Sequence, residues 1–233
     1  MDPSSLNENR LYPSRSPVFF LLKGILLVIA LFSLGTLPCR AQQQQPIIDM
    51  ETLNRLINDK ATADAAFVTG KRISEFCSNC HGDKGVSVLP EVPNLAEQNI
   101  HYLFRQIELF VHGGRRNEFM EGLMKFLKPE ERAGLAVYYN RMKAVPTGKT
   151  YPETDKLAKI RFVQLCQRCH GPHGRGDETI PRIAGQHYEY IALTLHRYRD
   201  KTGERLNAEM TNNTHWLTDK DIEALARYLA SMK

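Results

Sequence analysis

Hydrophobic residues follow two different patterns along the chain. Residues 17–37 form a mainly apolar run with a single charge, at Lys23. From about residue 60 onwards, apolar residues recur every three or four positions, which is the spacing of a helix that buries one face. Alternating apolar and polar residues, which would indicate strands, are almost missing from the sequence. The pattern predicts an all-α protein behind an apolar amino-terminal segment.

The helical stretches come as two sets of three. In each set the first stretch leads into a Cys-x-x-Cys-His group, and the third has clear start signals. Pro129 is followed by two glutamates, which suits a first helical turn. Thr218 and Asp221 have the spacing of a capping box. The apolar positions of the six predicted helices are Ala65, Val68 and Phe76; Ile100, Leu103, Phe104, Ile107 and Phe110; Leu135, Val137 and Tyr138; Leu157, Ile160, Phe162 and Leu165; Tyr190, Ile191, Leu193 and Leu195; and Ile222, Leu225 and Leu229.

The amino-terminal run predicts export across a membrane. Residues 24–37 are uncharged, which fits the apolar region of a signal peptide and falls short of the ~20 residues that span a bilayer. Residues 39–41 resemble a cleavage site, and a run of glutamines follows them. We therefore interpret residues 1–41 as a signal peptide.

A retained membrane anchor is the alternative to cleavage. If the Lys23 ammonium reaches the membrane interface, the whole of residues 17–37 could stay in the bilayer. A lipid attached to Cys39 is disfavoured, because Pro38 stands where a small residue is expected. Either main interpretation exports the rest of the chain.

The exported part is an internal duplication. Four landmarks recur in the same order, 88 to 90 residues apart. They are residues 77–81 and 166–170 (Cys-x-x-Cys-His); residues 93–98 and 181–186 (Pro to Gln); Arg115, Asn117 and Met120 against Arg205, Asn207 and Met210; and residues 127–131 against 217–221. Residues 144–152, with two prolines and a glycine, read as a linker. We predict two domains of similar architecture, residues 42–147 and 148–233.

Composition and charge narrow the classes of function. The chain of 233 residues is 42% hydrophobic and 24% charged, which is the range of a globular protein. Beyond residue 41 it holds 27 Lys and Arg against 24 Asp and Glu, and the surplus lies in residues 148–233. This surplus is too small and too dispersed for a nucleic-acid-binding protein. A domain of about ninety residues also gains from a stabilising group at its centre.

The two Cys-x-x-Cys-His groups predict covalent haem. Cys77 and Cys80, like Cys166 and Cys169, are spaced to form thioethers with the two vinyl groups of one haem, and the adjacent histidine then faces the iron. A shared zinc site is disfavoured because the pairs lie in separate repeats. A redox disulfide is disfavoured because such pairs normally accompany a βαβ fold. We predict haem c at both groups, with His81 and His170 as proximal iron ligands.

The sixth iron ligand must recur in both repeats. Met120 follows His81 by 39 residues and Met210 follows His170 by 40, each in a stretch that reads as a loop. Met124 competes in the first copy, but Thr214 replaces it in the second. Met120 and Met210 are therefore the predicted ligands. The remaining histidines lack such counterparts and read as surface or packing residues: His101, His112, His173, His187, His196 and His215.

Further residues of both repeats suit the surroundings of a haem. Pro93 and Pro181 could each present a backbone carbonyl to the second ring nitrogen of the proximal histidine. Arg115 and Arg205 could face haem propionates. The repeated tyrosines, Tyr102 and Tyr190, read mainly as packing residues, with a propionate contact as the alternative.

The order of these motifs, found twice, resembles the dihaem cytochrome c4 family over roughly residues 60–232. The resemblance implies two class I cytochrome c folds with their haem edges close together. Carried over residue by residue, it implies His81 and Met120 on one iron and His170 and Met210 on the other. Departures are small, such as Glu97 where the family tends to have glycine.

The resemblance also implies a function. It predicts an electron carrier of the bacterial periplasm, without catalytic residues, that exchanges electrons with redox proteins such as a quinol-oxidising complex and a terminal oxidase. One alternative is a respiratory-complex subunit tethered through residues 17–37. The other is a dihaem enzyme, such as a peroxidase or a thiosulfate dehydrogenase, which would need an open or unusually ligated iron.

Overall fold

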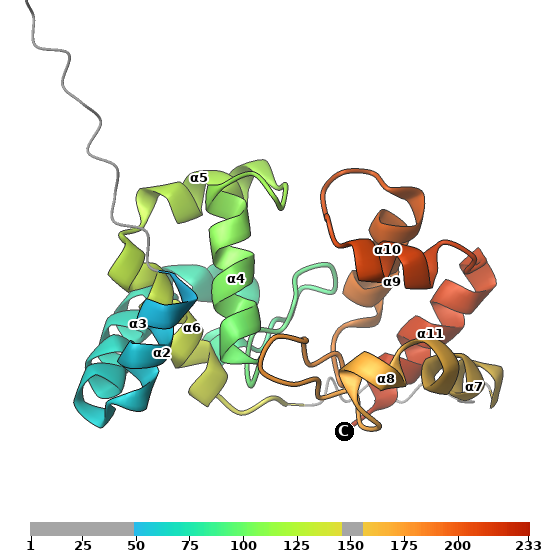
Figure 1. Ribbon diagram of the computed structural model, residues 1–233, viewed down its shortest axis with the longest axis horizontal. Helices are drawn as coiled ribbons and strands as arrows, with labels where there is room; N and C mark the ends of the chain where they lie inside the picture. The colour runs from blue at the N-terminus through green and yellow to red at the C-terminus, as the bar shows by residue number, and fades with distance from the viewer. Residues whose placement is uncertain (1–48, 146–155) are drawn as a thin grey trace, which may run out of the picture. The chain divides into compact units, whose positions relative to one another are not determined.

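A computed structural model of the chain describes residues 49–145 and 156–233 (Figure 1). The predicted signal peptide or anchor, Cys39 and most of the predicted linker lie outside the described residues. Residues 45–233 form one compact unit. We call the described residues 49–145 the first module and 156–233 the second module; the domain boundary at residue 147 stays a prediction. None of the described helices combines the length and apolar character needed to cross a membrane.

The described residues are helical and contain no strand, which confirms the all-α prediction. In the first module the helices are α2 (Met50–Asn58), α3 (Lys60–His81), the short 3-10 turn η1 (Asp83–Gly85), α4 (Ile100–Val111), α5 (Glu118–Phe126) and α6 (Pro129–Arg141). In the second module they are α7 (Lys156–Leu165), α8 (Gln167–His170), α9 (Tyr188–Asp200), α10 (Ala208–Thr214) and α11 (Asp219–Ser231).

The first module is built on a very close crossing of α3 and α6. Gly70 lies against Gly134, and a Cβ atom added to Gly70 would overlap the Gly134 carbonyl and stand 2.8 Å from Tyr138 Cβ. Small residues at both positions let the two backbones touch. The crossing also brings Phe67 onto Tyr138, with ring centroids 5.5 Å apart. Leu53, Phe104 and Met124 complete the core.

The second module has a similar core, in which the shorter helix α7 takes the place of α3. Phe162 of α7 is 1% exposed and packs on Tyr228 of α11, with ring centroids again 5.5 Å apart. Ile222, Leu225 and Leu229 line the buried side of α11 at helical spacing, together with Ile191 and Leu195 of α9. The capping box at Thr218 is confirmed: the Asp221 N–H donates to Thr218 Oγ1 at 3.2 Å, and the Thr218 N–H donates to Asp221 Oδ2 at 3.0 Å.

Helix α2 has no counterpart in the repeat and was not among the predicted helices. Its first turn is capped by Asp49, which accepts the Thr52 N–H at 2.8 Å. Leu53 buries completely in the first-module core. Asp59 then caps α3 by accepting the Thr62 N–H at 2.9 Å, so the chain passes directly from one helix into the next.

Candidate functional site

Each Cys-x-x-Cys-His group lies where a helix ends. His81 is the last residue of α3 and His170 the last of α8, and the glycine after each has a positive φ, 75° at Gly82 and 74° at Gly171. A residue without a Cβ adopts this conformation readily, so the chain turns sharply after the histidine. In the first module α3 therefore carries both cysteines on its last turns, whereas in the second module Cys166 precedes α8 and Cys169 lies within it.

The four cysteines of these groups are free thiols. Within each group the first cysteine is half-buried and the second is exposed. Burial raises the pKa of the Cys77 thiol and raises that of Cys166 to about 12. Both thiols of each group are therefore available for thioether bonds.

Both histidine rings are held by a proline carbonyl, as the sequence analysis anticipated. His81 Nδ1 donates to the Pro93 carbonyl at 3.0 Å, and His170 Nδ1 donates to the Pro181 carbonyl at the same distance. A carbonyl can only accept, so the proton is on Nδ1 and the Nε2 lone pair is free. Burial lowers the pKa of both histidines, which favours the neutral ring that a metal ion binds.

The methionines lie in helices, so the loop prediction was wrong. Met120 is in the first turn of α5 and Met210 in the first turn of α10. In both modules the asparagine three residues earlier caps the helix: Asn117 Oδ1 accepts the Met120 N–H at 3.0 Å, and Asn207 Oδ1 accepts the Met210 N–H at 2.8 Å. The repeated Asn-x-x-Met spacing was the signal for this cap.

The two methionines differ from Met124 in their surroundings. Met120 and Met210 are partly buried at the edge of the apolar cores. Met124 is 2% exposed and belongs to the core of the first module itself. Met124 is therefore a packing residue, which leaves Met120 as the first-module candidate.

The repeated arginines meet in one cluster. Arg115 and Arg205 pair through an isolated antiparallel bridge of their backbones. Tyr190 Oη accepts from the guanidinium of Arg115 at 3.2 Å and also from that of Arg205. Arg205 further donates to Tyr102 Oη at 3.3 Å and to Tyr198 Oη at 3.2 Å. The tyrosines therefore bind the arginines rather than merely packing.

This cluster places two cations together in a buried site. Among the described residues, neither Arg115 nor Arg205 has an acidic side chain within ion-pair distance, and Arg205 Nε is buried without a partner. Burial and the charge of Arg205 lower the pKa of Arg115. Burial acts to raise the pKa of Tyr190, but the two guanidinium charges outweigh it and lower the pKa to about 8. Buried cations with spare donors fit carboxylate groups such as haem propionates.

Several of the other histidines make specific contacts, and the contact of His187 joins the second module to Ser87 of the first. His101 Nε2 lies 2.6 Å from Asn54 Oδ1, and His187 Nε2 lies 2.9 Å from the Ser87 carbonyl. The ring of His215 stacks on Trp216, with centroids 3.9 Å apart. His112, His173 and His196 are exposed or half-exposed. In the residues that the structure describes, none of these rings gathers with other metal-ligating side chains into a cluster.

Comparison with known proteins agrees with this geometry. The Cytochrome c family model matches residues 158–233, which is the second module. Cytochrome c4 of Azotobacter vinelandii is 31% identical over 194 residues, which cover 74% of this chain and 90% of that protein. The chain belongs to the cytochrome c4 family. As a member, it is an electron-transfer cytochrome that carries two haem c groups.

Structural and functional relatives extend the comparison. The structure of cytochrome c4 from Acidithiobacillus ferrooxidans is 29% identical and superimposes with a TM-score of 0.63, covering 68% of this chain and all of that one. A protein of Thiomonas intermedia named thiosulfate dehydrogenase electron acceptor is 30% identical, over 72% of this chain and 84% of its own length. The class I cytochrome c fold that the resemblance implied is confirmed by the structural relatives.

Proposed function

We infer that this member of the cytochrome c4 family is a periplasmic electron carrier in which the chain itself would supply both protein ligands to each of two irons. The observation that carries the inference is the matching pair of histidines, each with its Nε2 lone pair free and its Nδ1 proton held by a proline carbonyl. In this proposal Cys77 and Cys80 hold one haem, and Cys166 and Cys169 hold the other.

Each iron takes one histidine and one methionine in the proposal. His81 and Met120 serve the first iron, and His170 and Met210 serve the second. The carbonyl that orients the histidine raises its basicity, and the asparagine cap fixes the backbone of the methionine. Both ligands are thus positioned by hydrogen bonds of the protein before they meet iron.

This ligand set explains why the protein transfers electrons and need not bind a substrate at iron. When bound, a haem c with histidine and thioether ligands supplies a one-electron couple of high potential. The chain's own residues would supply a histidine and a methionine to each iron, and Arg115 and Arg205 would neutralise the propionates. Fixed ligands and partners keep the geometry nearly unchanged between oxidation states.

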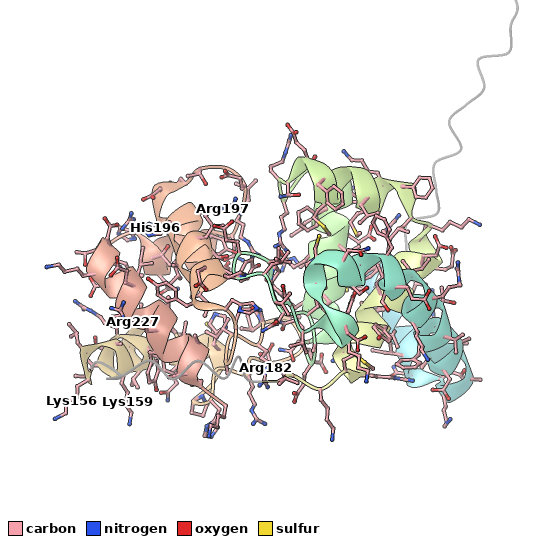
Figure 2. All side chains as sticks on the ribbon, turned by 180° about the vertical axis from the view of Figure 1, so that it is seen from behind. Lys156, Lys159, Arg182, His196, Arg197 and Arg227 are labelled. Atoms are coloured by element: carbon pink, nitrogen blue, oxygen red, sulfur yellow. The ribbon has the colours of Figure 1, made fainter. Side chains whose placement is uncertain are left out.

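The partners are other redox proteins in this proposal. A relative named as an electron acceptor of thiosulfate dehydrogenase supports a dehydrogenase as a donor. A quinol-oxidising complex as donor and a terminal oxidase as acceptor follow from the family resemblance alone. Figure 2 labels Lys and Arg side chains of the second module, among them Lys156 and Lys159 on α7 and Arg227 on α11. Dispersed cations of this kind suit a weak electrostatic encounter of the sort that transient redox pairs form.

A membrane-tethered subunit is the second candidate. The mainly apolar residues 17–37 favour it, because the run has 21 residues and only one charge. The same haem sites would then work beside a respiratory complex rather than move between complexes.

The mass of the purified native protein tests both the number of attached haems and the cleavage of residues 1–41. The proposal predicts two covalent haem additions and the loss of residues 1–41; a chain that keeps those residues supports the tethered subunit. In a Cys77→Ala/Cys80→Ala variant one haem addition should disappear, and in Cys166→Ala/Cys169→Ala the other. Two haems retained in either double variant would contradict the assigned attachment sites. Catalytic turnover of peroxide or thiosulfate by the wild-type protein would contradict the role of carrier.

A further inference from the structure

Each histidine-orienting peptide is bound on its other side by the opposite module. The Pro93 carbonyl accepts from His81, and the N–H of the same peptide group, that of Asn94, donates to Gln186 Oε1 at 2.9 Å. Gln186 belongs to the second module. One peptide group therefore connects a side chain of the second module to the histidine of the first.

The second module has the same arrangement in reverse. The Pro181 carbonyl accepts from His170, and the Arg182 N–H of that peptide group donates to Gln98 Oε1 at 2.7 Å. Gln98 belongs to the first module. The repeat makes Gln98 and Gln186 equivalent positions, 88 residues apart. The contact is therefore reciprocal, as in an interface between two identical subunits.

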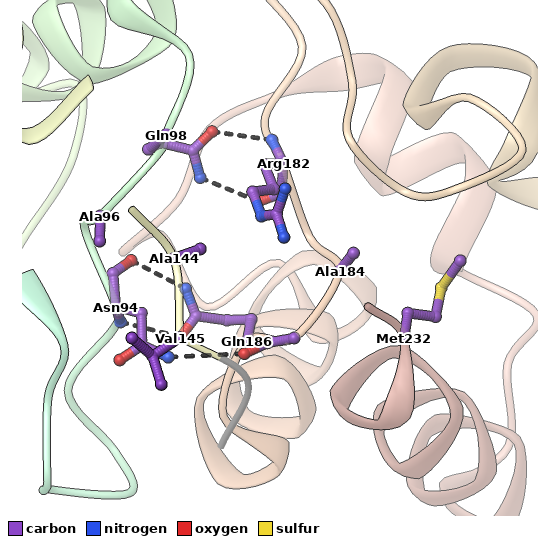
Figure 3. Close-up of a pocket in the computed structure, with 10 residues that line it drawn as sticks. Asn94, Ala96, Gln98, Ala144, Val145, Arg182, Ala184, Gln186 and Met232 are labelled. Atoms are coloured by element: carbon purple, nitrogen blue, oxygen red, sulfur yellow. Dashed lines mark hydrogen bonds between the residues drawn. The ribbon is translucent and has the colours of Figure 1, made fainter. Parts of the chain in front are cut away.

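A second hydrogen bond makes each glutamine a clamp. Gln186 Nε2 donates to the Asn94 carbonyl at 3.0 Å, and Gln98 Nε2 donates to the Arg182 carbonyl at 2.8 Å. Figure 3 shows both clamps beside the pocket that these residues line. Gln98 is 6% exposed and Gln186 is 9% exposed, so water competes little for these bonds.

We propose that Gln98 and Gln186 are cross-module positioning residues, each of which tunes the iron of the module to which it does not belong. The proposal rests on the ligation by His81 and His170 inferred above. An acceptor on the peptide N–H increases the electron density on the carbonyl oxygen, because hydrogen bonds in a chain polarise one another. The carbonyl then binds the histidine proton more strongly and makes the ring a more basic ligand. A more basic ligand stabilises ferric iron and lowers the potential of that haem.

The glutamines also have a local role that the test must separate. Gln98 Oε1 accepts the Asn99 N–H at 2.9 Å and Gln186 Oε1 accepts the His187 N–H at 3.0 Å, just before α4 and α9 respectively. A purely local role would affect the module that carries the glutamine. The proposed role affects the other module, so the location of the change distinguishes the two.

Potentiometric titration of the intact dihaem protein is the experiment. Gln186→Met keeps the length of the side chain but removes the acceptor, and it should raise the potential of the first-module haem. We expect a roughly three- to tenfold higher ferrous-to-ferric ratio at fixed ambient potential, the size of a change in one hydrogen bond. Gln186→Glu keeps an acceptor and adds negative charge, so it should shift the same haem in the opposite direction. Gln98→Met should raise the potential of the second-module haem instead.

The control and the assignment of the two haems complete the test. Gln164→Met makes the same substitution at an exposed position of α7 and should leave both potentials unchanged. The Met120→His variant identifies the first-module haem, because only that haem should lose its sulfur-to-iron absorption band. Potentials that stay fixed in Gln186→Met, or that shift most in the module carrying the glutamine, would overturn the proposal. Loss of the band from neither haem in Met120→His would instead overturn the ligand assignment.

Discussion

In the first module a single helix of 22 residues, α3, carries the cysteine pair and its histidine, whereas in the second module the corresponding stretch is divided into α7 and α8 at Cys166. The first module also has the additional helix α2 and the glycine crossing of α3 with α6. The two copies thus use different frameworks.

The bonds around the predicted iron ligands are nevertheless the same in both copies. Each histidine donates to a proline carbonyl at 3.0 Å, and each methionine follows an asparagine cap. The comparison teaches that the ligand positions depend on a few local hydrogen bonds and that the framework behind them can vary. Substitutions in the framework should therefore affect one module, whereas equivalent substitutions at the ligands should affect both alike.

The largest expected change in stability comes from a substitution at the crossing of α3 and α6. Gly70→Ala would force α3 away from Gly134 and should destabilise the first module by about 3 kcal/mol, since the added methyl group meets backbone that cannot move aside. Thermal unfolding followed by the haem absorption of each module measures this. The matched control Gly122→Ala adds its methyl group where no atom lies within 4 Å and should change stability by less than about 1 kcal/mol. Equal loss of stability in the two variants would contradict the close approach of α3 and α6 as the cause of the effect.

An intermediate effect is expected at the asparagine caps. Asn117→Ala and Asn207→Ala should each cost about 1 kcal/mol. Loss of the cap should disturb the position of Met210 more than that of Met120. The start of α5 keeps a second hydrogen bond, from the Asn117 N–H to Glu121 Oε1 at 3.1 Å. Helix α10 is also shorter, with seven residues against nine in α5. The denaturant concentration at which each sulfur-to-iron band disappears measures this difference. Asn212→Ala, at an exposed position of α10, is the control and should have little effect.

The smallest effect concerns the start of the last helix. Thr218→Ala should cost about 0.5–1 kcal/mol, because its hydroxyl accepts the Asp221 N–H. Lys128→Ala should change stability very little, because a lysine side chain has no acceptor for a backbone N–H. At this helix start the capping bond runs from the Lys128 N–H to Glu131, and the substitution keeps it. Chemical denaturation of the two variants compares the modules directly, and equal costs would contradict this account.

The same caps predict a dependence on pH. Hydrogen bonds from Thr218 lower the pKa of Asp221, and the Lys128 N–H lowers that of Glu131. A carboxyl whose pKa is lower in the folded state stabilises the fold above its ordinary pKa of about 4, and this contribution is lost as the pH falls further. Asp221→Asn should therefore reduce stability at neutral pH and flatten its acid dependence between about pH 5 and 2. An acid profile identical to that of the wild type would contradict this contribution.

The sequence predicted the parts that depend on short spacings. The Pro93 and Pro181 carbonyls could be proposed as histidine partners, because each proline follows its histidine at nearly the same distance. The methionines were wrongly predicted to lie in loops, because a short capped helix of about two turns is difficult to distinguish from a loop in a polar stretch. Helix α2 was not predicted because it lies outside the repeat.

Contacts between the copies could not be predicted in the same way. The recurrence of Gln98 and Gln186 was visible, but a repeat does not tell whether a residue acts within its own copy or on the other one. The pairing of Arg115 with Arg205 depends likewise on how the two copies meet. These contacts are tertiary, and the spacing along the chain carries no information about them.

The central claim is that each iron has one histidine and one methionine ligand. The most direct measurement is the sulfur-to-iron absorption band of the ferric protein in the wild type, in Met120→Ala, in Met210→Ala and in the double variant. The account predicts that each single variant loses half of the band and that the double variant loses all of it. A single variant that keeps the full band, or a wild-type protein whose reduced form binds carbon monoxide readily, would contradict it.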